Sequence, residues 1–527
     1  MESNFVASGL SRRTFIQTGA LGLAVVGAMS LAGCTPGPAG TPSGAATEPI
    51  RGGRLKIGIV GGGSSEVISE YAGPTSVDHA RAAQVYDTLV GMKSDLTDWE
   101  PGLAEDMRVS DDSRVMTISL RDNVVFHDGQ PLTSEDVIAN LVAWADPANR
   151  NYAGLGEKYD ATSVRALDKL TVEVQFKEPW ARPHPLFTMP SCGIASKNRG
   201  QFNGTGPFVV ENFSPGNSSL MKRNPNYWEE GKPYVDEVEI LSFSDSDALI
   251  NATKSGEVHG MATVPFSQVP GFAADPQFAV LDVPSPTNSS FLVRTDQGPF
   301  QDVRARQGLK LLADRQQLVD VALLGFGEPG NDLVGPGLPF FDNTVPVPQQ
   351  DVDEAKSLFK AAGLGKETIT LHTADVGPGI VESAVLFAEQ INKTGLLDVK
   401  IQKEEPGAFY DPSQIWMKMN FTQSEFAPVR SLSQGYSLRT FAFNETHWAG
   451  PERDKFAKLL TQAEAANDAL ATEIWVEAQQ IWREQNGYLT WNSLRIIDVL
   501  GARVAGTVPH SGGPLGNYRF LDMWFTG

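Results

Sequence analysis

Residues 99–141 read "WEPGLAEDMRVSDDSRVMTISLRDNVVFHDGQPLTSEDVIANL" and combine the periods of a strand and a helix. In residues 116–120, apolar side chains alternate with polar ones, which is typical of a half-buried strand. Thr133 and Asp136 have the spacing of a helix capping box, and apolar positions at helical spacing follow them. We therefore expect a strand, a tight turn at residues 127–129 and a helix, in that order.

Other segments extend this α/β pattern. Residues 367–404 read strand, helix, strand, and such a βαβ unit implies that its two strands pair in parallel. Residues 302–325 carry an apolar stripe at helical spacing, which predicts one helix capped by its first aspartate and stopped by the glycines near its end. Two more helices are expected around residues 454–466 and 472–485.

Five ordered motifs resemble those of the family 5 extracellular solute-binding proteins, the receptors of ATP-driven importers for dipeptides, oligopeptides and nickel. The pieces P-x-L-A-E, S-D-D, F-H-D-G-x-P and T-x-E-D-V occur in order, and G-T-G-P-F and R-N-P-x-Y-W follow. Motifs in this order over several hundred residues are specific for the family. They occupy residues 99–141, 204–228, 247–261, 299–319 and 351–363.

The resemblance implies an α/β fold of the type II periplasmic-binding-protein class. Two lobes are expected, joined by two crossing segments, with an interlobe cleft and an extra subdomain in the first lobe. The expected parts are a signal peptide (1–34), a flexible linker (35–50), the first-lobe core (51–82, 205–287 and 492–527), its extra subdomain (83–204) and the second lobe (288–491), whose ends form the hinge segments.

The N-terminus predicts export and lipid anchoring. Arg12 and Arg13 precede a short apolar run and resemble a twin-arginine signal, and residues 31–34 resemble a lipobox that ends at Cys34. The run is shorter than the ~20 residues that a spanning helix needs. The Pro-, Gly- and Ser-rich segment 35–50 is typical of a flexible stalk. We expect an extracytoplasmic protein held at the outer face of the cell membrane by lipid on Cys34.

Composition excludes several function classes. The net charge of −20 argues against nucleic acid or an anionic membrane surface as a partner. With Cys34 lipidated, Cys192 is alone, so no internal disulfide is expected. The seven histidines show no metal-binding pair at helical spacing, and neither a phosphate loop nor a nucleophile elbow is present. We therefore predict no enzyme, no cofactor and no metal site.

The resemblance places the ligand between the lobes, where polar groups orient it and aromatic walls supply contact area. Candidate contacts lie on the crossing segments 285–293 and 487–495 and on the inner edge of the second lobe; for the tryptophans, a core role is the alternative. The candidate ligand-binding residues are Asn288, Ser289, Ser290, Phe291, Trp416, Phe421, Glu425, Arg430, Asn444, Trp448, Trp491 and Asn492.

The ligand class depends on a short stretch after residue 420. In peptide-binding relatives, an aspartate in this region pairs with the α-ammonium group of the peptide. With Phe421 at the family's tryptophan position, the aspartate position holds Ser424, and Glu425 replaces it only after a register shift. This departure puts peptides with a free amine in doubt. Arg430 is a candidate clamp for a carboxylate or another anion.

Several alternatives remain open at this point. The leading hypothesis is a monomeric receptor that delivers a peptide or another small organic ligand to ABC permease subunits. A sugar-like or amphiphilic ligand comes next, and a nickel chelate, for which only His447 and His259 lie in suitable regions, comes third. An exported hydrolase and a purely sensory receptor are the alternatives outside import.

Overall fold

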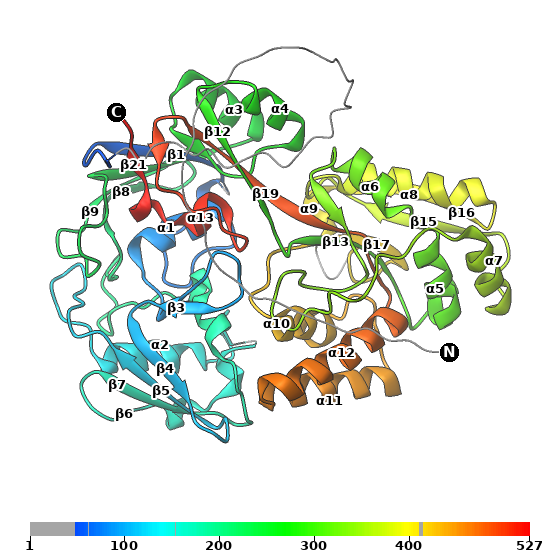
Figure 1. Ribbon diagram of the computed structural model, residues 1–527, viewed down its shortest axis with the longest axis horizontal. Helices are drawn as coiled ribbons and strands as arrows, with labels where there is room; N and C mark the ends of the chain where they lie inside the picture. The colour runs from blue at the N-terminus through cyan, green and yellow to red at the C-terminus, as the bar shows by residue number, and fades with distance from the viewer. Residues whose placement is uncertain (1–47, 62, 153, 411–414) are drawn as a thin grey trace, which may run out of the picture. The chain divides into compact units, whose positions relative to one another are not determined.

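The computed structural model describes residues 48–61, 63–152, 154–410 and 415–527 (Figure 1). The expectations for the twin-arginine motif, the lipobox and Cys34 fall on residues outside these ranges. Within them, no helix is both long enough and apolar enough to cross a membrane.

The largest sheet is built from both ends of the chain. Its order is β12-β19-β11-β1-β10-β9-β8. Strand β1 pairs in parallel with β10 and β11, and the remaining pairs are antiparallel. All these strands come from segments predicted for the first-lobe core. Their bounds are Arg54–Val60 (β1), Phe208–Ser214 (β8), Ser218–Arg223 (β9), Glu237–Phe243 (β10), Gly260–Met261 (β11), Phe278–Pro284 (β12) and Asn492–Gly501 (β19).

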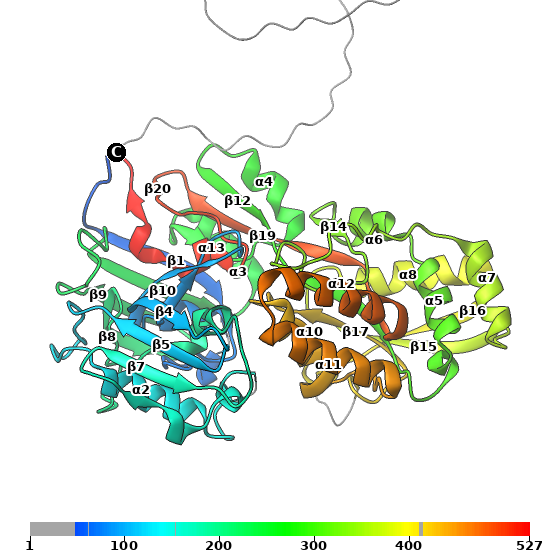
Figure 2. The same ribbon diagram turned by 60° about the horizontal axis from the view of Figure 1, so that its bottom comes forward.

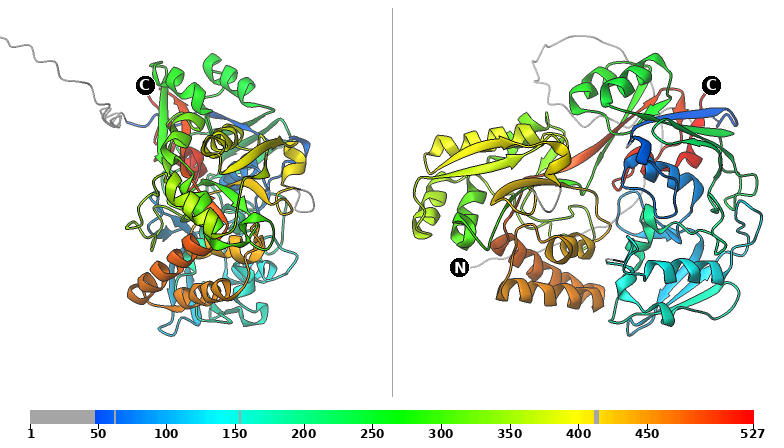
Figure 3. Two further views of the ribbon diagram at one scale, coloured as in Figure 1. Left: turned by 90° about the vertical axis from the view of Figure 1, so that its right-hand side faces the viewer. Right: turned by 180° about the vertical axis from the view of Figure 1, so that it is seen from behind.

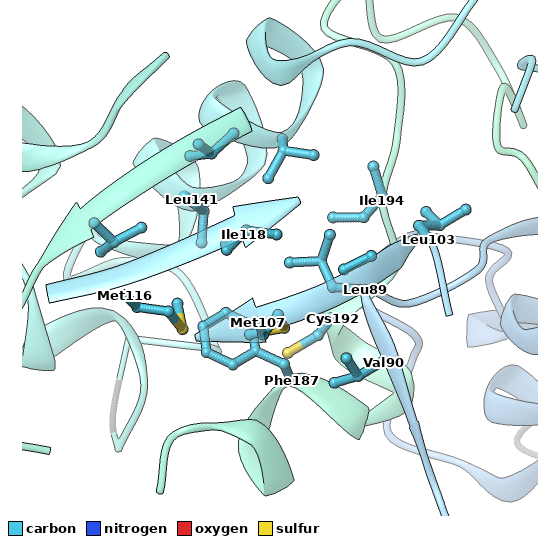
Figure 4. Packing of buried hydrophobic residues seen from close by; sticks show 14 of the residues in the cluster. Leu89, Val90, Leu103, Met107, Met116, Ile118, Leu141, Phe187, Cys192 and Ile194 are labelled. Atoms are coloured by element: carbon cyan, nitrogen blue, oxygen red, sulfur yellow. The ribbon is translucent and has the colours of Figure 1, made fainter. Parts of the chain in front are cut away.

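A four-stranded antiparallel sheet, β4-β5-β7-β6, lies in the segment predicted as the extra subdomain. The predicted strand is β5, whose Met116, Ile118 and Leu120 are buried, and the predicted helix is α2, with its capping box formed. Both predictions are confirmed. Cys192 is buried in the apolar core beneath this sheet (Figure 4). The bounds are Ala104–Val109 (β4), Val115–Leu120 (β5), Arg165–Ala166 (β6), Thr171–Gln175 (β7) and Ser134–Trp144 (α2).

The second lobe contains the predicted βαβ unit. Strands β15 and β16 pair in parallel, as expected, and α8 lies along them (Figure 3). A separate sheet has the order β17-β13-β18 and is antiparallel throughout. The bounds are Asn288–Val293 (β13), Glu367–Thr373 (β15), Leu397–Lys403 (β16), Phe421–Phe426 (β17), Tyr488–Thr490 (β18) and Ile380–Thr394 (α8).

The helix predicted over residues 302–325 is two helices, α5 (Val303–Leu311) and α6 (Arg315–Ala322). Asp302 caps α5 as expected, but the side chain of Asp314 accepts a hydrogen bond from the Gln317 N–H and starts a new helix. The expectation of one continuous helix was therefore wrong, because an aspartate inside the stripe acts as a second N-cap.

Two paired helices, α11 (Pro451–Ala465) and α12 (Asp468–Gln485), complete the second lobe (Figure 2). Both were expected from the sequence. The remaining elements are helices and short strands, of which β14 pairs with β19 of the large sheet. Their bounds are Ser76–Val85 (α1), Ser246–Ser255 (α3), Val269–Ala273 (α4), Val352–Ala361 (α7), Pro406–Phe409 (α9), Leu432–Ser437 (α10), Pro514–Tyr518 (α13), Val90–Met92 (β2), Trp99–Pro101 (β3), Gly327–Pro329 (β14), Val504–Ala505 (β20) and Trp524–Phe525 (β21).

Two segments connect the large sheet to the β17-β13-β18 sheet. Strand β12 leads into β13, and β18 leads through Trp491 into β19, which Figure 1 shows running out from the large sheet. The segments hydrogen-bond to each other: the Leu494 N–H donates to the Thr287 carbonyl at 2.8 Å, and the Ser289 N–H donates to Asn492 Oδ1 at 2.7 Å. Any hinge motion here therefore moves the two segments together.

Candidate ligand-binding site

Three of the candidate aromatic residues pack into one ring cluster of the second lobe. Phe291 lies 4.5 Å from Phe387 and also contacts Phe421 and Trp491, measured between ring centroids. All three candidates are almost fully buried in the apolar core around α8. This packing accounts for their burial without a ligand. We therefore do not count Phe291, Phe421 and Trp491 among the residues that contact the ligand.

Trp416, Trp448 and Asn444 belong to a second aromatic region beside α11 and α12. The Trp448 ring contacts Phe456 and Trp482. Asn444 holds this loop, because its Oδ1 accepts from the Trp448 N–H at 2.9 Å and its Nδ2 donates to the Trp448 carbonyl at 3.1 Å. Trp448 therefore packs within this aromatic region, and Asn444 holds the loop closed.

The polar candidates on the crossing segments hold those segments together. Besides the Ser289–Asn492 bond, the hydroxyls of Ser290 and Thr490 lie 2.9 Å apart. Three buried atoms of this group have no hydrogen-bond partner among the described residues: Asn288 Oδ1, Ser289 Oγ and Asn492 Nδ2. Buried polar groups are normally paired, so these three atoms are unused donors or acceptors of the crossing segments.

A cavity of about 820 Å³, here called the Glu425 cavity, lies between the two predicted lobes. The first lobe contributes residues 263–267 and residues 494–497 of β19. The second lobe contributes the loop before α8 and the end of β17, with Glu425. Its volume is within the range of sites that enclose small organic ligands.

Glu425 presents an unsatisfied carboxylate at this cavity. Its Oε2 is buried and has no hydrogen-bond partner in the described structure. Burial raises the pKa of this carboxyl from 4.5 to about 7. Glycine at position 377 leaves room for this carboxylate, because a Cβ there would lie only 2.4 Å from Glu425 Oε2. A desolvated carboxylate with a free oxygen is suited to bind a cation.

The side chains of β17 alternate between the two faces of the strand. This alternation decides whether Ser424 or Glu425 faces the Glu425 cavity. Phe421 contacts Phe387 of α8, the Gln423 side chain donates to Ser383 Oγ at 3.0 Å, and Glu425 continues the same face into the cavity. Ser424 points to the opposite face of the strand. Glu425 is therefore the acidic group that this strand presents to the Glu425 cavity.

The remaining charges at the Glu425 cavity are mainly acidic. Asp375 and Glu382 also line it and are exposed. The one lining arginine among the described residues, Arg495, already pairs with Asp282 at 2.5 Å. The cavity therefore offers an excess of negative charge to its occupant.

A second cavity, of about 440 Å³, lies between the extra subdomain and the second lobe and is lined by Arg430; we call it the Arg430 cavity. Direct contacts join its two walls. Arg182 pairs with Asp468 at 3.0 Å and donates to the carbonyls of Ala463 and Ala466, at the end of α11. Lys158 pairs with Glu464 at 2.8 Å. The two lobes are thus in contact in this structure.

The histidines make structural contacts. His259 accepts from the Lys56 N–H at 3.1 Å, and His447 lies 2.9 Å from the Met417 carbonyl. In the part of the chain that the structure describes, no three His, Cys, Asp or Glu side chains are grouped as a metal site would need. Neither imidazole lines the Glu425 cavity.

Comparison with known proteins agrees with this two-lobe geometry. The profile of the bacterial extracellular solute-binding proteins, family 5, matches residues 98–446, more than half of the chain. The chain belongs to this family. The predicted function class, a solute-binding receptor of an ABC importer, and the extracytoplasmic location are thereby confirmed.

Relatives of this family 5 protein are similar in length and fold. It is 24% identical over 458 residues to the glutathione-binding protein GsiB of Escherichia coli O1:K1, covering 81% of this chain and 87% of that protein. The periplasmic binding protein DppA of Helicobacter pylori, in complex with the peptide STSA, is similar with a TM-score of 0.75, 21% identity and coverage of 90% and 99%. NikZ of Campylobacter jejuni, in complex with Ni(L-His), is similar with a TM-score of 0.74, 18% identity and coverage of 89% and 99%. These relatives are binding proteins, and they give no support to the hydrolase alternative.

Sequence reasoning did not find several residues that line the cavities of this family 5 protein. Asp375 and Glu382 precede or begin α8, and Arg182 lies in the subdomain, far along the chain from the second-lobe residues that it contacts. Their proximity to Glu425 or Arg430 arises only from the fold. A local signal existed for Asp375 and Glu382, since loops at the carboxyl ends of parallel strands commonly form sites.

Proposed function

We propose that this family 5 receptor captures a small organic ligand with a protonated amine, such as a short peptide, in the Glu425 cavity. The observation that carries the proposal is the buried, unpaired Oε2 of Glu425 in a cavity formed by both lobes. A ligand ammonium group would supply the missing hydrogen-bond donor and the compensating charge. The glutathione-binding protein GsiB and the binding protein DppA, whose structure holds the peptide STSA, support this ligand class.

Ligand binding then stabilises the closed arrangement of the lobes. Residues of both lobes line the Glu425 cavity, so an occupant contacts both at once only when the lobes are close. The ligand shifts the equilibrium by its differential affinity for the closed state. The closed form is what the permease subunits of the importer would recognise.

The remaining parts of the proposal concern location and chemistry. The protein is exported through its twin-arginine signal, is anchored by lipid on Cys34 at the outer face of the cell membrane, and acts as a monomer. It binds and releases its ligand without chemical change. The supporting observations are the sequence of residues 11–34 and the binding-protein relatives.

The test uses pairs of ligands that differ only in the amine. Dipeptide amides with a free amine and their N-acetylated forms are compared by thermal shift and calorimetry, since binding to the native state alone raises its stability. We expect binding of the free-amine forms only. Glu425→Gln is expected to weaken this binding by about tenfold to a hundredfold, as for loss of a hydrogen bond to a charged group.

A matched control is Glu389→Gln, which alters an exposed carboxylate of α8. This variant should bind like the unmodified protein. Equal responses to the free and acetylated peptides, or no response to either, would contradict the proposed amine site.

A further inference from the structure

A third cavity, of about 490 Å³, lies within the first lobe, and we call it the Trp524 cavity. One wall is the β2-β3 hairpin of the extra subdomain, at residues 92–100, and the other is the C-terminal segment 506–524 together with residues 232–234. In the described structure, it shares no lining residue with the Glu425 cavity and has none from the second lobe. An occupant of the Trp524 cavity therefore does not need the two lobes to be close.

Two aromatic rings form the apolar side of the Trp524 cavity. The rings of Trp524 and Tyr234 lie 5.3 Å apart, measured between centroids. The indole lies directly against the backbone at Gly506, where φ is +93° and an added Cβ would lie 2.2 Å from a ring carbon of Trp524. Only glycine admits the ring at this distance. Val508, which is 62% exposed, extends this apolar side. The backbone thus fixes a flat apolar surface at the cavity.

Three polar groups of the residues that line this cavity are unused. Trp524 Nε1 and Thr507 Oγ1 are buried and have no hydrogen-bond partner in the described structure. The half-buried carboxylate of Glu100 makes neither an ion pair nor a hydrogen bond with any described residue. Indole N–H groups normally have a partner when they are buried. The cavity thus offers one donor, one hydroxyl and one acceptor to an occupant.

The cations that line the Trp524 cavity are already paired within the protein. Lys232 pairs with one oxygen of Asp522 at 2.6 Å, and Arg519 pairs with the other at 2.9 Å. Lys93 pairs with Asp98 at 2.8 Å. An anionic ligand would have to compete with these carboxylates, and a cationic ligand would face three cations at the wall. The charges therefore favour a neutral occupant.

A saccharide has the features that these groups require. The C–H face of a sugar ring packs flat on an indole, and sugar hydroxyls both donate and accept hydrogen bonds. One hydroxyl can donate to Glu100 and another can accept from Trp524 Nε1, while Thr507 Oγ1 takes either role. The volume of the cavity is within the range of sites for small organic molecules.

We propose that the Trp524 cavity is a second binding site of this protein and takes a neutral saccharide. The site is separate from the Glu425 cavity, so it does not rest on the proposed amine ligand. A free sugar and the end of a longer glycan present the same ring faces and hydroxyls, so the test includes both sources.

The binding test uses glucose, galactose and N-acetylglucosamine as single rings, and maltotriose and chitotriose as short chains. The indole N–H signals of the ¹⁵N-labelled protein are followed by NMR, and Trp524→Phe identifies the Trp524 signal by its loss. We expect at least one saccharide to shift this signal in a saturable way, whereas choline and inorganic phosphate should not. Tighter binding of a chain than of its single ring supports a glycan as the source, and equal binding supports a free sugar.

Two variants test the polar contacts without disturbing the core. Glu100→Gln should weaken binding of that saccharide about tenfold or more, as for loss of a hydrogen bond to a charged group, and Thr507→Val about threefold to tenfold. Glu105→Gln, which alters an exposed carboxylate of β4, should bind like the unmodified protein. The proposal is wrong if no saccharide shifts the Trp524 signal, if only choline or phosphate does, or if both variants keep the full affinity.

A competition experiment separates this site from the Glu425 cavity. A saturating dipeptide amide should leave the affinity for the saccharide unchanged, and so should Glu425→Gln. Displacement of the saccharide by the dipeptide amide would place both ligands in one cavity and overturn the proposal. If dipeptide amides do not bind but a saccharide still shifts the Trp524 signal, the proposed function fails and the Trp524 site stands.

Discussion

Glu425→Gln is expected to remove a specific pH dependence of stability. Burial raises the pKa of Glu425 from 4.5 to about 7 in the folded protein. The folded state therefore binds this proton more tightly than the unfolded chain does. The stability that the group contributes is fully present below about pH 4.5 and is lost as the pH rises through 7. Glutamine stays neutral and shows no such loss.

The size of the effect follows from the two pKa values. Ionising Glu425 in the folded protein rather than in the unfolded chain costs about 3 kcal/mol, at roughly 1.4 kcal/mol per pKa unit. The free energy of unfolding of the unmodified protein should therefore fall relative to Glu425→Gln by about this amount between pH 4 and pH 8. Urea denaturation of the ligand-free protein across this range measures the difference, with Glu389→Gln as the control.

A bound ligand should reverse this pH dependence, because it favours the ionised form of Glu425. A cation beside Glu425 stabilises the ionised carboxylate and lowers its pKa. The affinity for a dipeptide amide, corrected for the fraction whose amine is protonated, should then rise with pH up to about 7 and level off above it. Glu425→Gln should show a flat profile. If the denaturation curves of the two proteins keep a constant separation from pH 4 to pH 8, Glu425 does not titrate as argued, and the reasoning fails.

Three further predictions test other parts of the structure. Arg182→Ala removes a cation that donates to carbonyls at the end of α11 and lies over the Phe340 ring at 4.7 Å. We expect this variant to have a larger radius of gyration by X-ray scattering and to release ligand faster. Unchanged values would show that this contact does not hold the two lobes together. Phe291→Ala should lower the free energy of unfolding by about 3 to 5 kcal/mol, as for a fully buried ring, and a loss below 1 kcal/mol in urea denaturation would contradict its core position. Burial raises the pKa of the Cys192 thiol to about 12, so iodoacetamide at pH 8 should label it only after unfolding; labelling of the native protein would place it at the surface.

Local patterns predicted the elements whose periodicity is complete within a few residues. The strand at residues 116–120, the helix capped by Thr133 and the parallel βαβ unit all have burial on the face that the sequence indicates. The single helix over 302–325 failed at Asp314, where one side-chain hydrogen bond starts a new helix. A cap within an apolar stripe is visible in sequence, but the stripe alone does not show that the helix breaks there.

The site was less predictable because it depends on strand register and on distant segments. Matching Phe421 to the family's tryptophan places Ser424 at the acidic position, yet the strand presents Glu425 to the cavity. A shift of one residue in a strand exchanges its two faces, so a sequence match with this uncertainty does not choose between neighbours. Arg430 was identified by residue type, but the lack, in the described structure, of a hydrogen-bond partner for its buried Nη1 is a property of three-dimensional packing.

The contacts between the lobes make opposing contributions, and the proposed dependence of closure on ligand follows from their balance. Arg182 and Lys158 bond across the lobes and favour closure. Glu425 and Arg430 become buried without partners in the same arrangement, which disfavours it. A ligand that pairs with either charge removes part of the penalty and shifts the equilibrium toward the closed form. An apolar solute of the same size would fill a cavity but leave both charges unpaired, so the charges that select the ligand also couple its binding to closure.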